Sequence, residues 1–219
     1  MGVAVATFFS GAQFTLDEMN SVTWATKARG LEAALSVFNL SLGLTVFFLA
    51  RVLGLLYFFN TIDNDPIIQR SKKQLLYNAI PFVFFFLLFA VMLMLREGYA
   101  VDPASGEVFM EKFKYFHNLV QMPIVLLLFL AGVLAVLGGI ALSLIRDTSN
   151  GIWFSGPGTV LVVFSLFMLA GFNNTAFYPS AYDLQSSLTI QKASSSHYTL
   201  VAMSYVSLFV PFVFAYIWY

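Results

Sequence analysis

The chain has 219 residues, of which 59% are apolar and only 10% are charged. Soluble domains carry about 25% charged residues, so this composition excludes an ordinary water-soluble protein. Lysine plus arginine and aspartate plus glutamate balance at 11 each, which gives no sign of a nucleic-acid partner. There are no cysteines, and their absence excludes disulfides, iron–sulfur clusters and thiolate metal sites.

The first 30 residues divide into a short apolar part and a polar part. Residues 1–14 lack the basic start of a secretory signal, and their apolar stretch ends near Gly11, too early to cross a membrane. We expect them to be the tail of a truncated membrane helix. Residues 15–30 follow as a polar connector, and residues 31–219 are expected to form a transmembrane bundle of about five helices.

Long apolar runs occupy most of residues 31–219. A helix needs about 20 apolar residues to cross the hydrocarbon core of a membrane. Because lipid offers the backbone no hydrogen-bond partners, each run must be a helix that satisfies its own N–H and C=O groups. The sequence therefore predicts an all-α, polytopic transmembrane helical bundle, with successive spans antiparallel. The expected spans are Leu31–Asn60, Leu75–Leu95, Asn118–Ile145, Gly158–Tyr178 and Tyr198–Tyr219.

An arginine lies inside the first expected span. A charged residue at the centre of a membrane helix costs about 2.5–3.5 kcal/mol on insertion scales and is a candidate functional residue. This span is longer than the membrane requires, so Arg51 can lie near one interface and snorkel. We expect snorkelling or a salt bridge between helices, with a transport or proton role as the alternative.

Small residues recur at helical spacing in two of the spans. Such stripes allow helix backbones to approach closely in a membrane. We expect close packing through both. They are Gly43, Ala50 and Gly54 in the first span, and Gly132, Ala135, Gly139 and Ser143 in the third.

The segments between spans predict a topology. The loop Thr61–Gln74 contains Arg70, Lys72 and Lys73, and this concentration of positive charge predicts the cytoplasmic side. The loops Arg96–His117 and Pro179–His197 are then expected together on the opposite side. Ser155-Gly156-Pro157-Gly158 is expected to break the chain and open the fourth span.

The spans offer few groups for chemistry. None has an aspartate or glutamate away from its ends, so the chain has no carboxylate relay for protons within the membrane. His117 and His197 each begin a span that enters from the same side. Together they could ligate a haem iron or a metal, but hydrogen bonding at the interface is the favoured interpretation. The sequence therefore assigns no catalytic residue and no metal site, and leaves cofactor binding open.

Several amides lie at or within membrane depth. They are Asn39, Gln121, Asn173 and Asn174. Hydrogen bonds between helices, worth about 0.6–2 kcal/mol each, explain them at least as well as ligand binding does.

The last part of the chain carries a distinctive loop. It runs through Leu169–Ser180 (LAGFNNTAFYPS), Asp183–Ile190 (DLQSSLTI) and Ser194–Ser196. This stretch resembles the last periplasmic loop of subunit II of cytochrome bd-type quinol oxidases. The similarity extends over essentially the whole chain, including Gly2–Val5 with Gly11–Phe14 at its start and the basic segment Gln69–Lys72.

The resemblance implies the C-terminal half, or slightly more, of such a subunit in the bacterial cytoplasmic (inner) membrane. The family oxidises quinol and reduces dioxygen to water. Its haem b and haem d are expected on the partner, subunit I, and a quinone or lipid tail between the helices is a further expectation. The family's acidic residues for proton uptake lie in the N-terminal helices of subunit II. No position of this sequence matches those residues. The resemblance thus implies a structural role for this chain within an oxidase.

A secondary transporter or channel fragment is the alternative function. Arg51 and the break at Gly156-Pro157-Gly158 could belong to a discontinuous helix at a substrate site. The lack of acidic residues inside the spans and the 25 phenylalanines argue against this alternative.

Overall fold

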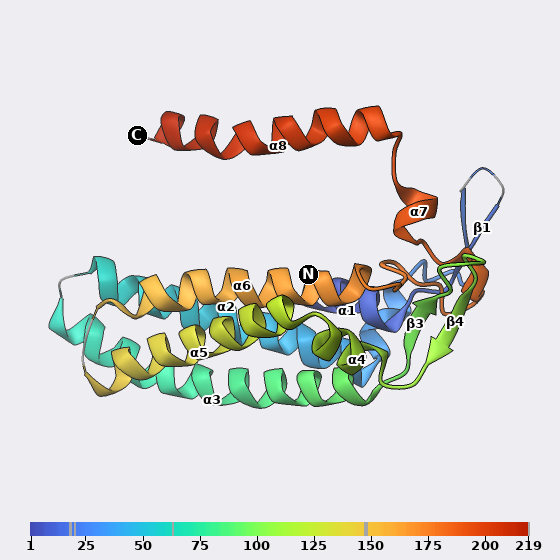
Figure 1. Ribbon diagram of the computed structural model, residues 1–219. Helices are drawn as coiled ribbons and strands as arrows, with labels where there is room; N and C mark the ends of the chain where they lie inside the picture. The colour runs from blue at the N-terminus through green and yellow to red at the C-terminus, as the bar shows by residue number, and fades with distance from the viewer. Residues whose placement is uncertain (18, 20, 63, 147–148, 219) are drawn as a thin grey trace.

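The computed structural model describes every residue except 18, 20, 63, 147, 148 and 219, and it is an all-α membrane bundle with two small hairpins (Figure 1). In the part that it describes, five helices are long and apolar enough to cross a membrane. These are α2 (Val37–Thr61), α3 (Asp65–Leu95), α5 (Pro123–Ile145), α6 (Gly151–Gly171) and α8 (His197–Trp218). The shorter helices are α1 (Gly2–Ser10), η1 (Leu31–Leu35), α4 (Lys114–Gln121), η2 (Leu184–Ser186) and α7 (Ile190–Ala193).

Four of the long helices, α2, α3, α5 and α6, run lengthwise beside one another, and α1 lies along α2 (Figure 1). Their apolar side chains form two buried clusters. The cluster nearer the hairpins includes Phe9, Phe38, Phe89 and Leu169. The other includes Val52, Leu56, Leu75, Val136 and Ile140.

The close contact of α5 with α6 depends on glycine pairs. A Cβ added to Gly132 would lie 2.8 Å from the carbonyl oxygen of Gly158, and one added to Gly139 would lie 2.5 Å from that of Gly151. The small-residue face expected on the third span is therefore confirmed. The stripe on the first span is confirmed only in part, because Gly43 contacts Val3 of α1 whereas Gly54 has no such neighbour within 4 Å.

The second span begins ten residues earlier than expected, at Asp65, so the expected loop Thr61–Gln74 is wrong. Asn64 accepts a hydrogen bond from the Ile67 amide, and Pro66 occupies the first turn, where a proline suits a helix. The basic residues of this segment consequently lie on the first turns of α3. The apolar run of α3 indicates which part of the helix lies in the membrane, but the helix itself begins before that run.

The third and fourth spans also differ from their expected bounds. The third is divided into α4 and α5 at Met122, because Pro123 lacks an N–H and disfavours helical backbone in the residue before it. The fourth is one continuous helix from Gly151 to Gly171, so the expected break at Ser155–Gly158 is wrong. Packing against α5 stabilises this glycine- and proline-containing segment, and Ser155 Oγ donates to the Val136 carbonyl at 3.1 Å.

The first and last spans start differently from one another. Residues 31–35 form the 3₁₀ helix η1, and the membrane helix α2 begins only at Val37. The last helix, α8, begins one residue earlier than expected, and Tyr219 lies outside the described residues. None of the residues of α8 is buried, and the helix stands apart from the other four (Figure 1). Its sequence is apolar on all sides, so hydropathy alone wrongly suggested that it joins the same bundle.

The hairpins and loops gather at one end of the bundle. Strand β1 (Phe14–Leu16) pairs with β2 (Val22–Trp24), and β3 (Gly98–Val101) pairs with β4 (Val108–Glu111). Single bridges join Ala12 to Ser180 and Ala100 to Thr175. The Gln185 side chain accepts from the Val108 N–H at 3.3 Å and donates to the Val108 carbonyl at 3.1 Å, so the expectation that the loops Arg96–His117 and Pro179–His197 share one side is confirmed.

Candidate functional site in the membrane bundle

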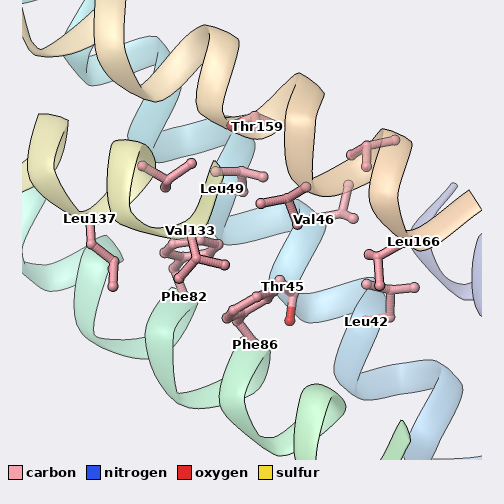
Figure 2. Close-up of a pocket in the computed structure, with 13 residues that line it drawn as sticks. Leu42, Thr45, Val46, Leu49, Phe82, Phe86, Val133, Leu137, Thr159 and Leu166 are labelled. Atoms are coloured by element: carbon pink, nitrogen blue, oxygen red, sulfur yellow. The ribbon is translucent and has the colours of Figure 1, made fainter. Parts of the chain in front are cut away.

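A small apolar cavity lies among α2, α3, α5 and α6 (Figure 2). Its volume is about 70 Å³. The polar side chains in its lining are Thr45 and Thr159, and each hydroxyl donates to a carbonyl of its own helix at 2.8 Å. Apolar cavities of this kind stay dry, so the space suits a hydrocarbon group and not a charged ligand. The other lining residues are Leu42, Val46, Leu49, Phe82, Phe86, Val133, Val136, Leu137, Val162, Val163 and Leu166.

A buried amide network joins α4 to the segment after α6. Asn118 is fully buried and its Nδ2 donates to Thr175 Oγ1 at 2.8 Å and to the Leu169 carbonyl at 3.2 Å. Asn173 Nδ2 donates in turn to Asn118 Oδ1 at 3.0 Å and to Gln121 Oε1 at 2.5 Å. The structure thus brings together Gln121 and Asn173, two of the amides noted in the sequence. Asn118, which lies at the centre of this hydrogen-bond network, was not predicted from the sequence.

Asn39 lies elsewhere, beside a polar cavity of about 220 Å³ near the hairpin end. Its Nδ2 donates to the Ala33 carbonyl at 3.0 Å, whereas its buried Oδ1 has no hydrogen-bond partner among the described residues. Glu32 and Arg96 also line this cavity, and the Arg96 guanidinium lies 4.6 Å from the centroid of the Phe38 ring. A cavity with these polar groups is suited to water.

Two tyrosines fix the end of α1 to the same region. Tyr99 OH and Tyr115 OH donate to the carbonyls of Ser10 and Phe9, each at 3.1 Å. Burial raises the pKa of the Tyr99 hydroxyl, against the opposing effect of nearby Arg96. The phenol therefore stays protonated and keeps its donor role.

His117 lies in a small charged cluster at the start of α4. Its Nδ1 is 2.9 Å from Glu111 Oε1, and Lys114 Nζ is 3.2 Å from Glu111 Oε2. Partial burial would raise the pKa of the Glu111 carboxyl, but the hydrogen bonds with His117 and Lys114 outweigh it and hold that pKa below its ordinary value. This geometry gives His117 a local interfacial partner.

His197 lies at the first residue of α8, which stands apart from the bundle. In the described part of the chain no group of three histidine, cysteine, aspartate or glutamate side chains could hold a metal ion. The interior cavity is lined by aliphatic, aromatic and threonine side chains and offers no axial ligand. The residues that line this cavity therefore do not fit a haem.

Arg51 finds its partner on the neighbouring helix. Its Nε donates to Asn78 Oδ1 at 2.6 Å, and its guanidinium lies 5.8 Å from the centroid of the Phe47 ring. This partner is an amide, and the described residues show no salt bridge for Arg51, so of the two expected arrangements snorkelling remains the prediction. Asn78 lies within the expected second span, but hydropathy alone gave no indication that it pairs with Arg51.

The arrangement defines a class of protein: a multispan membrane subunit with an apolar interior and polar networks gathered at its ends. The chain belongs to the family of subunit II of the cytochrome bd terminal oxidase, whose family model matches residues 1–219. No curated protein matches the chain. The family is part of a terminal oxidase complex, so the chain is a membrane component of a respiratory oxidoreductase.

Proposed function

We propose that this chain is the structural membrane partner of a haem-bearing subunit I in a quinol oxidase. The complex would oxidise quinol and reduce dioxygen to water, with haem b and haem d on subunit I. This chain would contribute packing surfaces and a low-dielectric wall and would not carry out the reaction. The apolar cavity of Figure 2, without a free hydrogen-bonding group in its lining, supports that role.

The observation that carries the proposal is the exposure of α8. This helix has 22 residues and an apolar sequence, yet none of its residues is buried against the rest of the chain. Lipid can cover such a helix, but a helix held away from its own bundle leaves room for a neighbouring subunit on both of its sides. We assign that place to subunit I.

The apolar cavity suggests a second, smaller feature. Its hydrocarbon lining suits the tail of a quinone or a lipid and not a polar head group (Figure 2). A tail there would add apolar contacts between α2, α3 and α5. The complex would reside in the bacterial cytoplasmic membrane, where quinol is available.

Co-purification tests the proposal directly. The tagged chain, extracted with a mild detergent, is expected to bring down a second membrane protein together with haem that gives b- and d-type absorption. Recovery of the chain alone, without haem, would contradict the proposal. Flux of solutes through liposomes that contain only this chain would instead favour a transporter.

The two histidines supply an internal control for the location of the haem. His117→Ala and His197→Ala are expected to leave the haem content per complex unchanged, because His117 already pairs with Glu111 and His197 begins the exposed helix α8. Loss of a haem absorption band in either variant, with the subunit ratio unchanged, would show that this chain supplies a ligand.

A further inference from the structure

The outer seam between α2 and α3 carries cationic residues near one membrane interface. Arg51 on α2 is exposed and hydrogen-bonds to Asn78. Residues 70, 74 and 78 of α3 follow one another at intervals of four, so Arg70 and Gln74 continue the stripe on which Asn78 lies. Both of these side chains are exposed.

The depth of this stripe follows from helix geometry. Arg96, at the hairpin end of α3, is 18 residues from Asn78, or about 27 Å at 1.5 Å per residue. The hydrocarbon core is about 30 Å thick, so Asn78 and Arg51 lie just inside the far interface. Arg70, two turns further on, then lies at head-group level.

The charges on this stripe have no acidic partner within the described part of the chain. Arg51 bonds to a neutral amide, and neither Arg70 nor the Gln74 side chain has a described hydrogen bond or ion pair. Desolvated cations at this depth require an anion or water.

An aromatic surface continues the seam toward the membrane centre. Phe48 of α2 stacks on Phe85 of α3 with ring centroids 6.0 Å apart. The Phe47 ring contacts both neighbours, since its centroid lies 5.2 Å from that of Phe48 and 5.8 Å from the Arg51 guanidinium. Phe47 is 54% exposed. A cationic head-group site followed by an exposed apolar strip matches the two ends of a phospholipid.

We propose that this seam binds an anionic phospholipid. The phosphate would be held by the Arg51 guanidinium and Arg70, with the Gln74 amide as an additional donor, and an acyl chain would lie along Phe47 and Phe48. The guanidinium suits the phosphate because its planar fork donates two parallel hydrogen bonds. Nearby Lys73, also exposed, adds positive charge at the same level. The inference requires only that the chain is embedded in a membrane, not that it serves an oxidase.

The test measures lipid binding to the intact detergent-purified complex by native mass spectrometry and by thermal unfolding during titration with phosphatidylglycerol. Arg51→Gln and Arg70→Gln are each expected to weaken the binding of phosphatidylglycerol about fivefold, since one basic residue near the surface contributes about that factor. The matched control is Lys27→Gln, which removes an exposed cation at the opposite end of the bundle and is expected to have no effect.

Further arms separate the alternatives. Phosphatidylcholine and inorganic phosphate are expected to give no stabilisation, and equal stabilisation by either would overturn the proposal. If Arg51→Gln released another subunit while phosphatidylglycerol binding stayed unchanged, Arg51 would pair with an acidic side chain of a partner and the proposal would fail. Arg70→Gln keeps the test decisive if Arg51→Gln does not fold, because Arg70 is exposed and makes no described contact.

Discussion

At the scale of single residues, the polar groups that matter most are those that join separate segments. Asn118 illustrates this, because its amide uses both its donor and its acceptor capacity within a fully buried site. A buried polar group that loses its partners keeps its desolvation cost. The end of α6 therefore depends on one side chain of α4.

Replacing that side chain gives a test. Asn118→Ala is expected to lower the free energy of unfolding by about 1–3 kcal/mol, because Thr175 and Asn173 lose a buried hydrogen-bond partner. Reversible denaturation in detergent measures the change. Asn60→Ala is the control, since Asn60 is exposed and is expected to change stability by less than about 0.5 kcal/mol. Equal effects of the two substitutions would contradict this account.

Glu111 makes a pH-dependent contribution at the same end of the molecule. Its pKa is lowered in the folded protein from an ordinary value of 4.5, because the hydrogen bonds with His117 and Lys114 outweigh the effect of burial. A depressed carboxyl pKa gives stability that is present above 4.5 and is lost as the pH falls through the folded value.

The unfolding temperature is therefore expected to fall on acidification below about pH 4.5, and Glu111→Gln is expected to flatten that part of the profile. Thermal unfolding between pH 7 and pH 3 measures both. Glu107→Gln is the control, because no described residue pairs with the Glu107 carboxylate as His117 and Lys114 pair with Glu111, and this variant is expected to follow the unmodified profile. A Glu111→Gln profile as steep as that of the unmodified protein would refute the role of this carboxylate.

At the scale of helices, the α5–α6 contact depends on the absence of side chains. Backbones approach closely where Gly139 faces Gly151 and Gly132 faces Gly158. In a membrane, van der Waals contact of this kind replaces the hydrophobic effect between helices. The glycines thus set the distance between the two helices.

Adjacent glycines of α5 allow a matched comparison. Gly139→Val is expected to destabilise the bundle by about 1–3 kcal/mol, since the new side chain would overlap the backbone of α6. Gly138→Val is expected to be nearly neutral, because no atom of a neighbouring segment lies within 4 Å of an added Cβ. Denaturation in detergent distinguishes them, and a larger loss for Gly138→Val would show that the packing face is misassigned.

At the scale of the whole molecule, the position of α8 separates this helix from the four that share a core (Figure 1). In each of the four bundle helices, about 30% of the most apolar stretch is buried, whereas none of that stretch is buried in α8. Only another chain, another segment or lipid can cover such a surface. This is the surface on which the proposed partnership depends.

Because the chain has no cysteine, single cysteines on α8 can be labelled without background. We expect cysteines at one stripe, such as Tyr205→Cys and Phe209→Cys, to be protected from an apolar maleimide in the complex and labelled after subunits are separated. A cysteine at Leu134, exposed on α5, is the control for lipid-facing labelling. Uniform labelling around α8 in the complex would contradict a protein partner there.

The sequence by itself determined that the chain crosses a membrane and where the apolar runs lie, because lipid requires about 20 apolar residues in a self-satisfied helix. It also identified Gly132 and Gly139 as a packing face, since spacing alone places them on one side of α5. Their partners on α6 were not evident, because the Gly156-Pro157-Gly158 segment suggested a break by its local propensity.

Only the tertiary structure decided the helix ends and the contacts between them. Packing against α5 keeps α6 helical through Pro157, and Asn64 begins α3 ahead of its apolar run. The pairs Arg51–Asn78 and Asn118–Thr175 join residues 27 and 57 positions apart. Such pairs depend on how helices are arranged in space, and in apolar sequences many arrangements share the same hydropathy, so hydropathy could not select among them.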